Sequence, residues 1–151
     1  MKVKLAYGKN GLIVDLPANN VDVIEPSFVE GLKDEDSAIL QALQNPVASP
    51  PLRQLADSDA SVAVIFPDRT RAMPSRTVLP ILLSQLNHIP KKQITLINAV
   101  GTHRPNTEVE LNEMLGENIV QNYRIVQHQP KNRSSMVRLG LSKFGNEVWV
   151  N

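Results

Sequence analysis

Two short polar clusters in this sequence contain the residue types that could do chemistry. They are Asp68-Arg69-Thr70-Arg71 and Gly101-Thr102-His103-Arg104. A guanidinium group can bind a carboxylate or a phosphate through two parallel hydrogen bonds, so Arg69 or Arg71 could hold an acidic substrate or a cofactor phosphate. Asp68 could orient one of these arginines. His103 could act as a general base, because imidazole titrates near neutral pH.

Each cluster also has a simpler interpretation, which the sequence leaves open. The first could be a surface loop with an exposed ion pair between aspartate and arginine, and such pairs contribute little to stability. His103 could hydrogen-bond the backbone of a tight loop. His128 also follows a predicted strand, but the Gln129-Pro130 after it is typical of an ordinary loop. His88 is predicted at the carboxyl end of a helix, where it suits the helix dipole, so we interpret both of these histidines as structural.

The two clusters follow apolar runs that predict strands. Residues 61–66 and residues 93–100 are such runs, as expected of strands that are buried on both faces. Between them, residues 75–87 carry leucines at helical spacing, although Pro80 should kink this helix or move its start to a later residue. Residues 123–128 predict a third strand.

Other helices are predicted from their ends. The acidic run Asp34-Glu35-Asp36 suits the first turn of a helix that stops before Pro46. A second short helix is expected over about residues 51–57. The capping box of residues 107–110 opens a further helix, and Gly116 should end it.

The order of these elements predicts the fold class. Alternating strands and helices over residues 61–128 favour a parallel sheet with flanking helices. Residues 2–7 and 12–16 predict an N-terminal β-hairpin, and residues 136–141 and 147–150 predict a C-terminal β-hairpin. We therefore predict an α/β fold with a parallel-sheet core and one hairpin at each end, in a single domain of residues 1–151. Because a predicted strand ends the sequence, we expect it to be a piece of a longer protein.

This fold would bring the two polar clusters together. In open α/β sheets, ligands bind beyond the carboxyl ends of the strands. Both clusters lie at such ends, so they should share one crevice if the first two strands are neighbours in the sheet.

Composition excludes several classes of function. The 151 residues include 16 basic and 15 acidic ones without a basic run, so nothing favours binding to nucleic acid or to an anionic membrane. Cysteine is absent, which excludes disulfides, thiolate metal sites and cysteine nucleophiles in these residues. With neither a signal core nor a run of the roughly 20 apolar residues that a membrane span needs, we expect a cytoplasmic protein.

Several well-known site motifs are missing as well. The three histidines are scattered and do not form a metal-ligand motif, so we predict no metal site in this chain. The sequence contains neither a glycine-rich phosphate loop nor a Gly-x-Ser-x-Gly elbow. The residues alone therefore indicate an anion site with a histidine in an α/β domain.

The two clusters, in their order and spacing, resemble the nickel-dependent lactate racemase family. Residues 68–71, after an apolar strand and before Pro74, match the Asp-Arg-Thr-Arg element of that family. Residues 101–105 match its Gly-Thr-His-Arg element. The opening hairpin at Tyr7-Gly8 and the stretch from residue 139 to residue 151 also resemble the family, so the similarity extends over nearly the whole chain.

This resemblance implies the N-terminal domain of a two-domain racemase or epimerase that acts on a 2-hydroxy acid. In the family, a histidine removes the hydroxyl proton while a hydride moves from the carbon to a nickel-pincer nucleotide. The keto acid then takes the hydride back on its other face. By this resemblance, His103 is an acid/base, Arg71 with Asp68 binds the substrate, and the cofactor-binding residues are Arg69, Thr70 and Thr102.

The remaining catalytic parts of the family belong to segments beyond residue 151. They are a second histidine, the lysine that tethers the cofactor, the histidine that binds nickel, and a C-terminal domain. We therefore expect these 151 residues to be inactive alone and to hold no cofactor tightly. The expected partners are a small 2-hydroxy acid and the C-terminal domain, without nucleic acid or membrane. The substrate could be lactate or another 2-hydroxy acid.

Two other functions remain open. The chain could be a non-catalytic anion-binding module of the same α/β fold. It could also be a phosphate-handling transferase that uses its paired arginines, although the missing glycine-rich loop counts against this.

Overall fold

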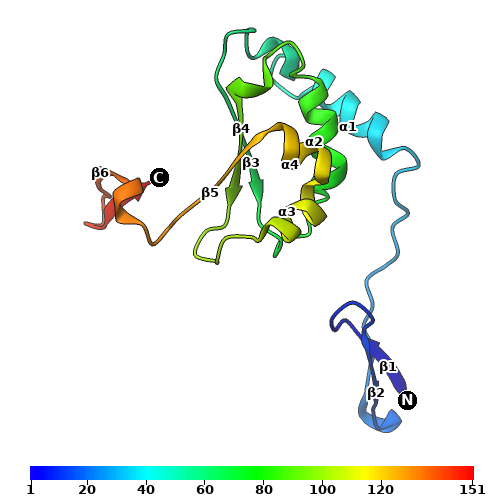
Figure 1. Cartoon of the computed structure of the whole chain (residues 1–151). Helices are drawn as coiled ribbons and strands as arrows, with labels where there is room; N and C mark the ends of the chain where they lie inside the picture. The colour runs from blue at the N-terminus through cyan, green and yellow to red at the C-terminus, as the bar shows by residue number, and fades with distance from the viewer. The chain divides into compact units, whose positions relative to one another are not determined.

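The computed structural model describes the backbone of residues 1–151 and every side chain except that of Ala18. The chain forms two compact units, Met1–Gly31 and Leu32–Asn151. In the first unit, β1 (Lys2–Leu5) pairs antiparallel with β2 (Leu12–Asp15), as predicted (Figure 1). A 3-10 helix, η1 (Ala18–Asn20), follows.

The second unit contains the sheet and the helices. Its elements, in order, are α1 (Glu35–Gln44), η2 (Leu52–Gln54), β3 (Val62–Pro67), α2 (Ser75–Ser84), η3 (Lys91–Gln93), β4 (Ile94–Ala99), α3 (Glu108–Leu115), α4 (Glu117–Asn122), β5 (Arg124–Gln127), η4 (Arg133–Ser135), β6 (Val137–Leu141) and β7 (Glu147–Val150). Strands β3, β4 and β5 form a parallel sheet in that order. The predicted α/β fold is therefore confirmed, and the antiparallel pair β6 and β7 confirms the C-terminal hairpin.

The register of the sheet places the strand ends side by side. Phe66 of β3 lies opposite Asn98 of β4, and Asn98 lies opposite Gln127 of β5. The loops that follow these strands therefore begin at a common edge of the sheet. The strands before the two polar clusters are therefore neighbours, which the sequence had left open.

One face of the sheet carries the hydrophobic core. Helices α2, α3 and α4 pack on this face (Figure 1). The buried apolar residues that form this core are Phe66, Leu79, Leu83, Leu86, Ile89, Ile94, Leu96, Leu111, Leu115 and Ile119. Ile65 of β3 points the other way and is 69% exposed. The expectation that residues 61–66 are buried on both faces is wrong, because the described helices around the core cover only the face that carries Phe66 and Leu96.

The helix ends agree only in part with the sequence prediction. The Asp34 side chain accepts a hydrogen bond from the Ser37 N–H at 3.0 Å and begins α1, and Thr107 and Glu110 form the predicted capping box of α3. Helix α2 begins at Ser75 with Pro80 inside it, so Pro80 does not delay its start, and the kink that was the other expected effect stays a prediction. The predicted second short helix is reduced to η2, and α4 was not predicted. Among the helices that the structure describes, none combines the length and hydropathy that a membrane crossing needs.

Candidate active site

The two polar clusters meet through a hydrogen bond between an aspartate and a histidine. Asp68 directly follows β3, and His103 lies in the loop after β4. The Nδ1 atom of His103 lies 2.7 Å from Oδ2 of Asp68. Asp68 is 4% exposed, whereas the His103 side chain is 50% exposed. A buried carboxylate therefore holds one side of an imidazole whose other side can meet a ligand.

The surroundings of Asp68 keep its carboxyl group ionised. The Thr70 hydroxyl donates a hydrogen bond to Oδ1 of Asp68 at 2.7 Å, and the Thr70 N–H donates to the same atom at 3.3 Å. The Thr70 hydroxyl, followed by His103, lowers the pKa of Asp68 against the opposing effect of burial.

An ionised Asp68 determines which nitrogen of His103 is free. Because the carboxylate is a hydrogen-bond acceptor, Nδ1 of His103 carries a proton and donates it to the bond. In neutral imidazole, Nε2 then has a free lone pair. Among the described residues, none forms a hydrogen bond with this Nε2. The pair has the arrangement of a base that is oriented by a carboxylate.

A second carboxylate, Glu110 in the first turn of α3, binds two of the arginines. Arg104 forms a bidentate pair with it, from Nη1 to Oε2 at 2.8 Å and from Nη2 to Oε1 at 2.7 Å. Nη1 of Arg69 donates to Oε1 of the same carboxylate. The Arg104 side chain, the Thr107 N–H, the Asn106 amide and the Arg69 side chain hold the pKa of Glu110 far below its usual range.

Arg71 differs from these two arginines. Its backbone N–H donates to the Asp68 carbonyl at 3.1 Å, and its side chain is exposed. With the other described residues, the Arg71 side chain forms neither a hydrogen bond nor an ion pair under the usual distance limits. Of the three arginines in the two clusters, Arg71 is the one whose guanidinium is available to an external anion.

Buried amides hold the loop that carries His103. Asn98, which is fully buried in β4, donates from Nδ2 to Asn106 Oδ1 at 2.8 Å and to Gln127 Oε1 at 3.0 Å. The Gln127 side chain also accepts from the Asn106 N–H at 2.7 Å and donates to the Asn106 carbonyl at 2.8 Å. These bonds fix the end of the loop to the edge of the sheet.

The sequence prediction missed Asn98, Asn106, Glu110 and Gln127 as members of the site. Two signals could have indicated them. One is the asparagine in the otherwise apolar strand of residues 94–99, and the other is the capping-box glutamate two residues after the start of α3.

A cavity of about 450 Å³ opens beside His103. Its walls are the loops after β4 and β5, with Thr102, His103, Arg104 and Pro105 on one side and His128, Gln129, Pro130, Lys131 and Asn132 on the other. Nδ1 of His128 lies 3.2 Å from Oδ1 of Asn151. The structure therefore places His128, which we interpreted as structural, on the wall of the cavity that contains His103.

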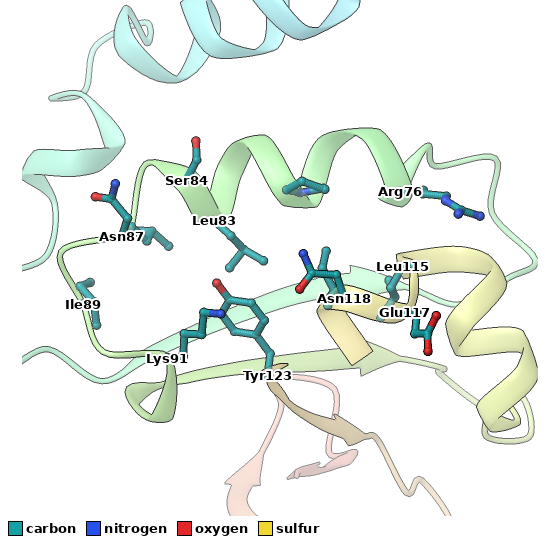
Figure 2. A pocket seen from close by; sticks show the side chains of 14 residues that line it. Arg76, Leu83, Ser84, Asn87, Ile89, Lys91, Leu115, Glu117, Asn118 and Tyr123 are labelled. Atoms are coloured by element: carbon teal, nitrogen blue, oxygen red, sulfur yellow. The ribbon is translucent and has the colours of Figure 1, made fainter. Parts of the chain in front are cut away.

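A larger cavity of about 620 Å³ lies elsewhere, between α2, α4 and the segment that leads to η3 (Figure 2). Leu83 and Tyr123 point into it, and Arg76 and Lys91 lie at its rim. The described residues that line it include neither a histidine nor a member of the two polar clusters. His88 is close to this region, but its Nε2 bonds the Ala56 carbonyl at 2.8 Å, which is a structural contact. We therefore place the candidate active site at the strand ends.

Comparisons with known proteins identify the family of the chain. Residues 7–151 match the family described as the lactate racemase N-terminal domain. This chain belongs to that family.

Two curated relatives are lactate racemases. The enzyme of Lactiplantibacillus plantarum is 37% identical over 153 residues, and that of Thermoanaerobacterium thermosaccharolyticum is 31% identical over 153 residues. Each alignment covers 99% of this chain but only 36% of the relative. The lactate racemase N-terminal domain seen here therefore spans 36% of the length of these enzymes.

One solved structure supports the same family, and a second supports the fold. The lactate racemase apoprotein of Thermoanaerobacterium thermosaccharolyticum matches with a TM-score of 0.76 and 28% identity, over 100% of this chain and 36% of that one. A protein of Thermotoga maritima matches with a TM-score of 0.61 and 20% identity, over 81% of this chain and 30% of that one. This second similarity supports the fold alone.

The donor groups of this lactate racemase domain suit an anion better than a metal ion. In the part of the chain that the structure describes, no group of three or more histidine, aspartate or glutamate side chains is arranged to hold a metal. Thr70 and Arg69, which we predicted to contact the cofactor, bond Asp68 and Glu110 respectively. Thr102 is exposed and lines the cavity beside His103. Hydroxyl and guanidinium groups fit the phosphate and ribose of a nucleotide.

The ionised carboxylates of this domain predict a loss of stability in acid. The pKa values of Glu110 and Asp68 are lowered in the folded state, so the unfolded chain binds more protons below its ordinary carboxyl pKa of about 4. The two ionised carboxylates stabilise the folded state fully above about pH 4. This stabilisation is lost as the pH falls toward their lowered pKa values in the folded state. We expect the midpoint of urea unfolding to decrease between about pH 5 and pH 3, and Glu110→Gln should flatten this decrease.

The exposed glutamate Glu108 of the same helix provides a matched control for this measurement. Glu108→Gln should retain the acid sensitivity of the unchanged chain. Equal pH dependence of Glu110→Gln and the unchanged chain would contradict the prediction.

Proposed function

We propose that this domain supplies one part of the active site of a 2-hydroxy acid racemase, with lactate as the simplest substrate. The observation that carries the proposal is the bond between His103 and the buried Asp68, which leaves Nε2 of His103 free. Membership of the lactate racemase N-terminal domain family supports it. Because the domain spans 36% of its curated relatives, the activity is proposed for a longer protein that contains it.

His103 has the chemistry that the reaction needs. Inversion at C2 of a 2-hydroxy acid requires the C2–H bond to break and to form again on the opposite face. Nε2 of His103 takes the hydroxyl proton while the C2 hydrogen leaves with its electron pair, which gives a 2-keto acid. The reverse transfers then restore the hydroxy acid. Asp68 stabilises the imidazolium that His103 becomes during the step.

Arg71 is the group that we assign to the substrate carboxylate. Its backbone N–H donates to the Asp68 carbonyl, and its side chain is exposed. A bidentate pair with a guanidinium fixes a carboxylate in one plane. This would place C2 and its hydroxyl group in a defined orientation toward His103. Arg71 would contact only the carboxylate of the substrate, so selectivity for the side chain of the 2-hydroxy acid would come from other residues.

A nickel-pincer nucleotide, when bound, would accept the hydride and return it. We propose that Thr102 and Arg69 face its nucleotide part, with Thr70 holding Asp68 in place. We assign no residue of this chain to nickel, since no cluster of suitable ligands occurs among its described residues. The metal ligands and the second acid/base are proposed to come from other segments of the full-length enzyme.

A non-catalytic anion-binding module is a weaker explanation of the same site. Such a module needs the arginines but not a histidine whose Nδ1 is bonded to a buried carboxylate and whose Nε2 is free. The hydrogen bond between Asp68 and His103 therefore favours the enzyme.

The full-length protein loaded with its cofactor provides the test. It should convert L-lactate and D-lactate separately into the same mixture of both. In D2O, the C2 hydrogen should be retained, because it leaves as a hydride and returns without solvent exchange. The isolated chain of 151 residues is the matched control and should give no conversion. A folded, loaded protein that converts neither lactate nor other 2-hydroxy acids would refute the proposal, and deuterium at C2 would refute the hydride step.

A further inference from the structure

The carboxylate of Glu110 joins the two loops that carry the catalytic pair. Arg69 belongs to the loop after β3 and is adjacent to Asp68, whereas Arg104 belongs to the loop after β4 and is adjacent to His103. Both guanidinium groups donate to Glu110. One carboxylate thus binds the neighbour of each member of the pair.

Glu110 is well suited to hold both loops. It is buried, and it accepts further bonds from the Asn106 amide at 3.1 Å and from the Thr107 N–H at 2.9 Å. It lies in the first turn of α3, which packs on the sheet, so its position is set by the core. Hydrogen bonds between charged groups are stronger than those between neutral groups, and the bidentate pair also fixes the orientation of the Arg104 guanidinium.

The loop that carries His103 needs such support. Residues 101–105 are all exposed, so packing contributes little to their position. Within this segment, the polar contacts given by the described residues are the bond between Asp68 and His103, the His103 N–H on the Val100 carbonyl at 3.0 Å, and the bonds of Arg104. Of these, the Arg104 pair with Glu110 ties the loop to a helix.

Glu110 also decides which arginine can bind substrate. It occupies Arg69 and Arg104 and leaves Arg71 without such a partner. If Glu110 lost its charge, three exposed guanidinium groups would compete for one carboxylate. Substrate would then bind in orientations in which C2 does not face His103.

We propose that Glu110 is a positioning residue of this active site, which acts through Arg69 and Arg104 to hold His103 on Asp68 and to reserve Arg71 for the substrate. The inference about catalysis depends on the proposed racemase function. The inference about the geometry of His103 does not.

Two variants of the full-length protein with its cofactor separate this role from simple helix capping. Glu110→Gln keeps the shape of the side chain and an oxygen that can accept from the Thr107 N–H, but it loses the charge that both arginines require. Thr107→Ala removes the other half of the capping box and leaves the ion pairs intact. We expect kcat of Glu110→Gln to decrease about 10- to 100-fold, because a displacement of about 1 Å at a reacting group has effects of this size. Thr107→Ala should keep kcat within about threefold.

A readout independent of activity is the imidazole NMR spectrum of His103. The unchanged protein and Thr107→Ala should show a hydrogen-bonded Nδ1 proton far downfield, and Glu110→Gln should lose or broaden it. If Glu110→Gln does not fold, Arg104→Lys provides the same test, since it keeps the charge but loses the bidentate pair. The proposal would be overturned if the folded Glu110→Gln or Arg104→Lys variant kept both the downfield Nδ1 proton and the original kcat. It would also be overturned if Thr107→Ala lost the proton and kcat to the same extent as Glu110→Gln.

The same experiment distinguishes failure of the proposed function. If the unchanged protein converts no 2-hydroxy acid but Glu110→Gln still loses the Nδ1 proton, Glu110 positions the pair and the racemase assignment is wrong. If the protein racemises lactate but the proton and kcat do not depend on Glu110, the racemase assignment stands and the positioning role is wrong.

Discussion

Replacement of His103 by glutamine should lower kcat for lactate racemisation by the full-length protein about 100- to 10,000-fold, the usual contribution of a general acid/base. Glutamine can still donate a hydrogen bond to Asp68, but it cannot take the hydroxyl proton. The KM should change little, because the carboxylate contact is assigned to Arg71. Initial rates in both directions, with the cofactor content determined for each variant, provide the measurement.

Two other histidines serve as controls for this prediction. His88→Gln should leave kcat nearly unchanged, since His88 bonds the Ala56 carbonyl away from the strand ends. His128→Gln tests the second histidine of the cavity. If His128→Gln reduced kcat as much as His103→Gln, the proposal that the second acid/base comes from other segments would be wrong. If His103→Gln retained more than about a tenth of the original kcat, the assignment of the base to His103 would be wrong.

Replacement of Arg71 by lysine should raise the KM for 2-hydroxy acids about 10- to 100-fold. Lysine keeps the positive charge but cannot form the bidentate pair, and hydrogen bonds to charged groups contribute about 1.5–3 kcal/mol. The pair forms in the ground state as well as during reaction, so kcat should decrease less than KM rises. Steady-state kinetics over a wide range of lactate concentration would measure both quantities.

Arg76 offers a matched control for this arginine. It is an exposed residue of α2 that lines the larger cavity on the helical face (Figure 2). Arg76→Lys should leave KM unchanged. An unchanged KM in Arg71→Lys would show that another group, such as Arg69 or Arg104, binds the substrate carboxylate.

The sequence predicted the order of elements because each depends on local patterns. The apolar runs before Asp68 and Gly101 became β3 and β4, and the capping box at Thr107 opened α3. The two clusters were expected to share one crevice. They meet at one edge of the sheet through Asp68 and His103, but the cavity beside His103 is lined by the second cluster and the loop after β5. These features needed only periodicity, end signals and the rule for ligand sites in parallel sheets.

Other features depend on contacts that local patterns do not encode. Burial of residues 61–66 on both faces was wrongly expected, because an apolar run does not reveal how many layers of helices cover a sheet. Glu110 was recognised as a capping residue, but its bonds to Arg69 and Arg104 join residues 41 and 6 positions apart in the sequence. The place of His128 beside His103 likewise depends on the pairing of β5 with β4.

The central claim is that Nε2 of His103 faces the hydroxyl group of a bound 2-hydroxy acid while Asp68 holds Nδ1. A crystal structure of the full-length protein with its cofactor and lactate tests this most directly. The account predicts the C2 hydroxyl within hydrogen-bond distance of His103 Nε2, the substrate carboxylate on Arg71, and an unchanged bond between His103 and Asp68. Lactate bound with its hydroxyl away from His103, or His103 released from Asp68, would contradict it.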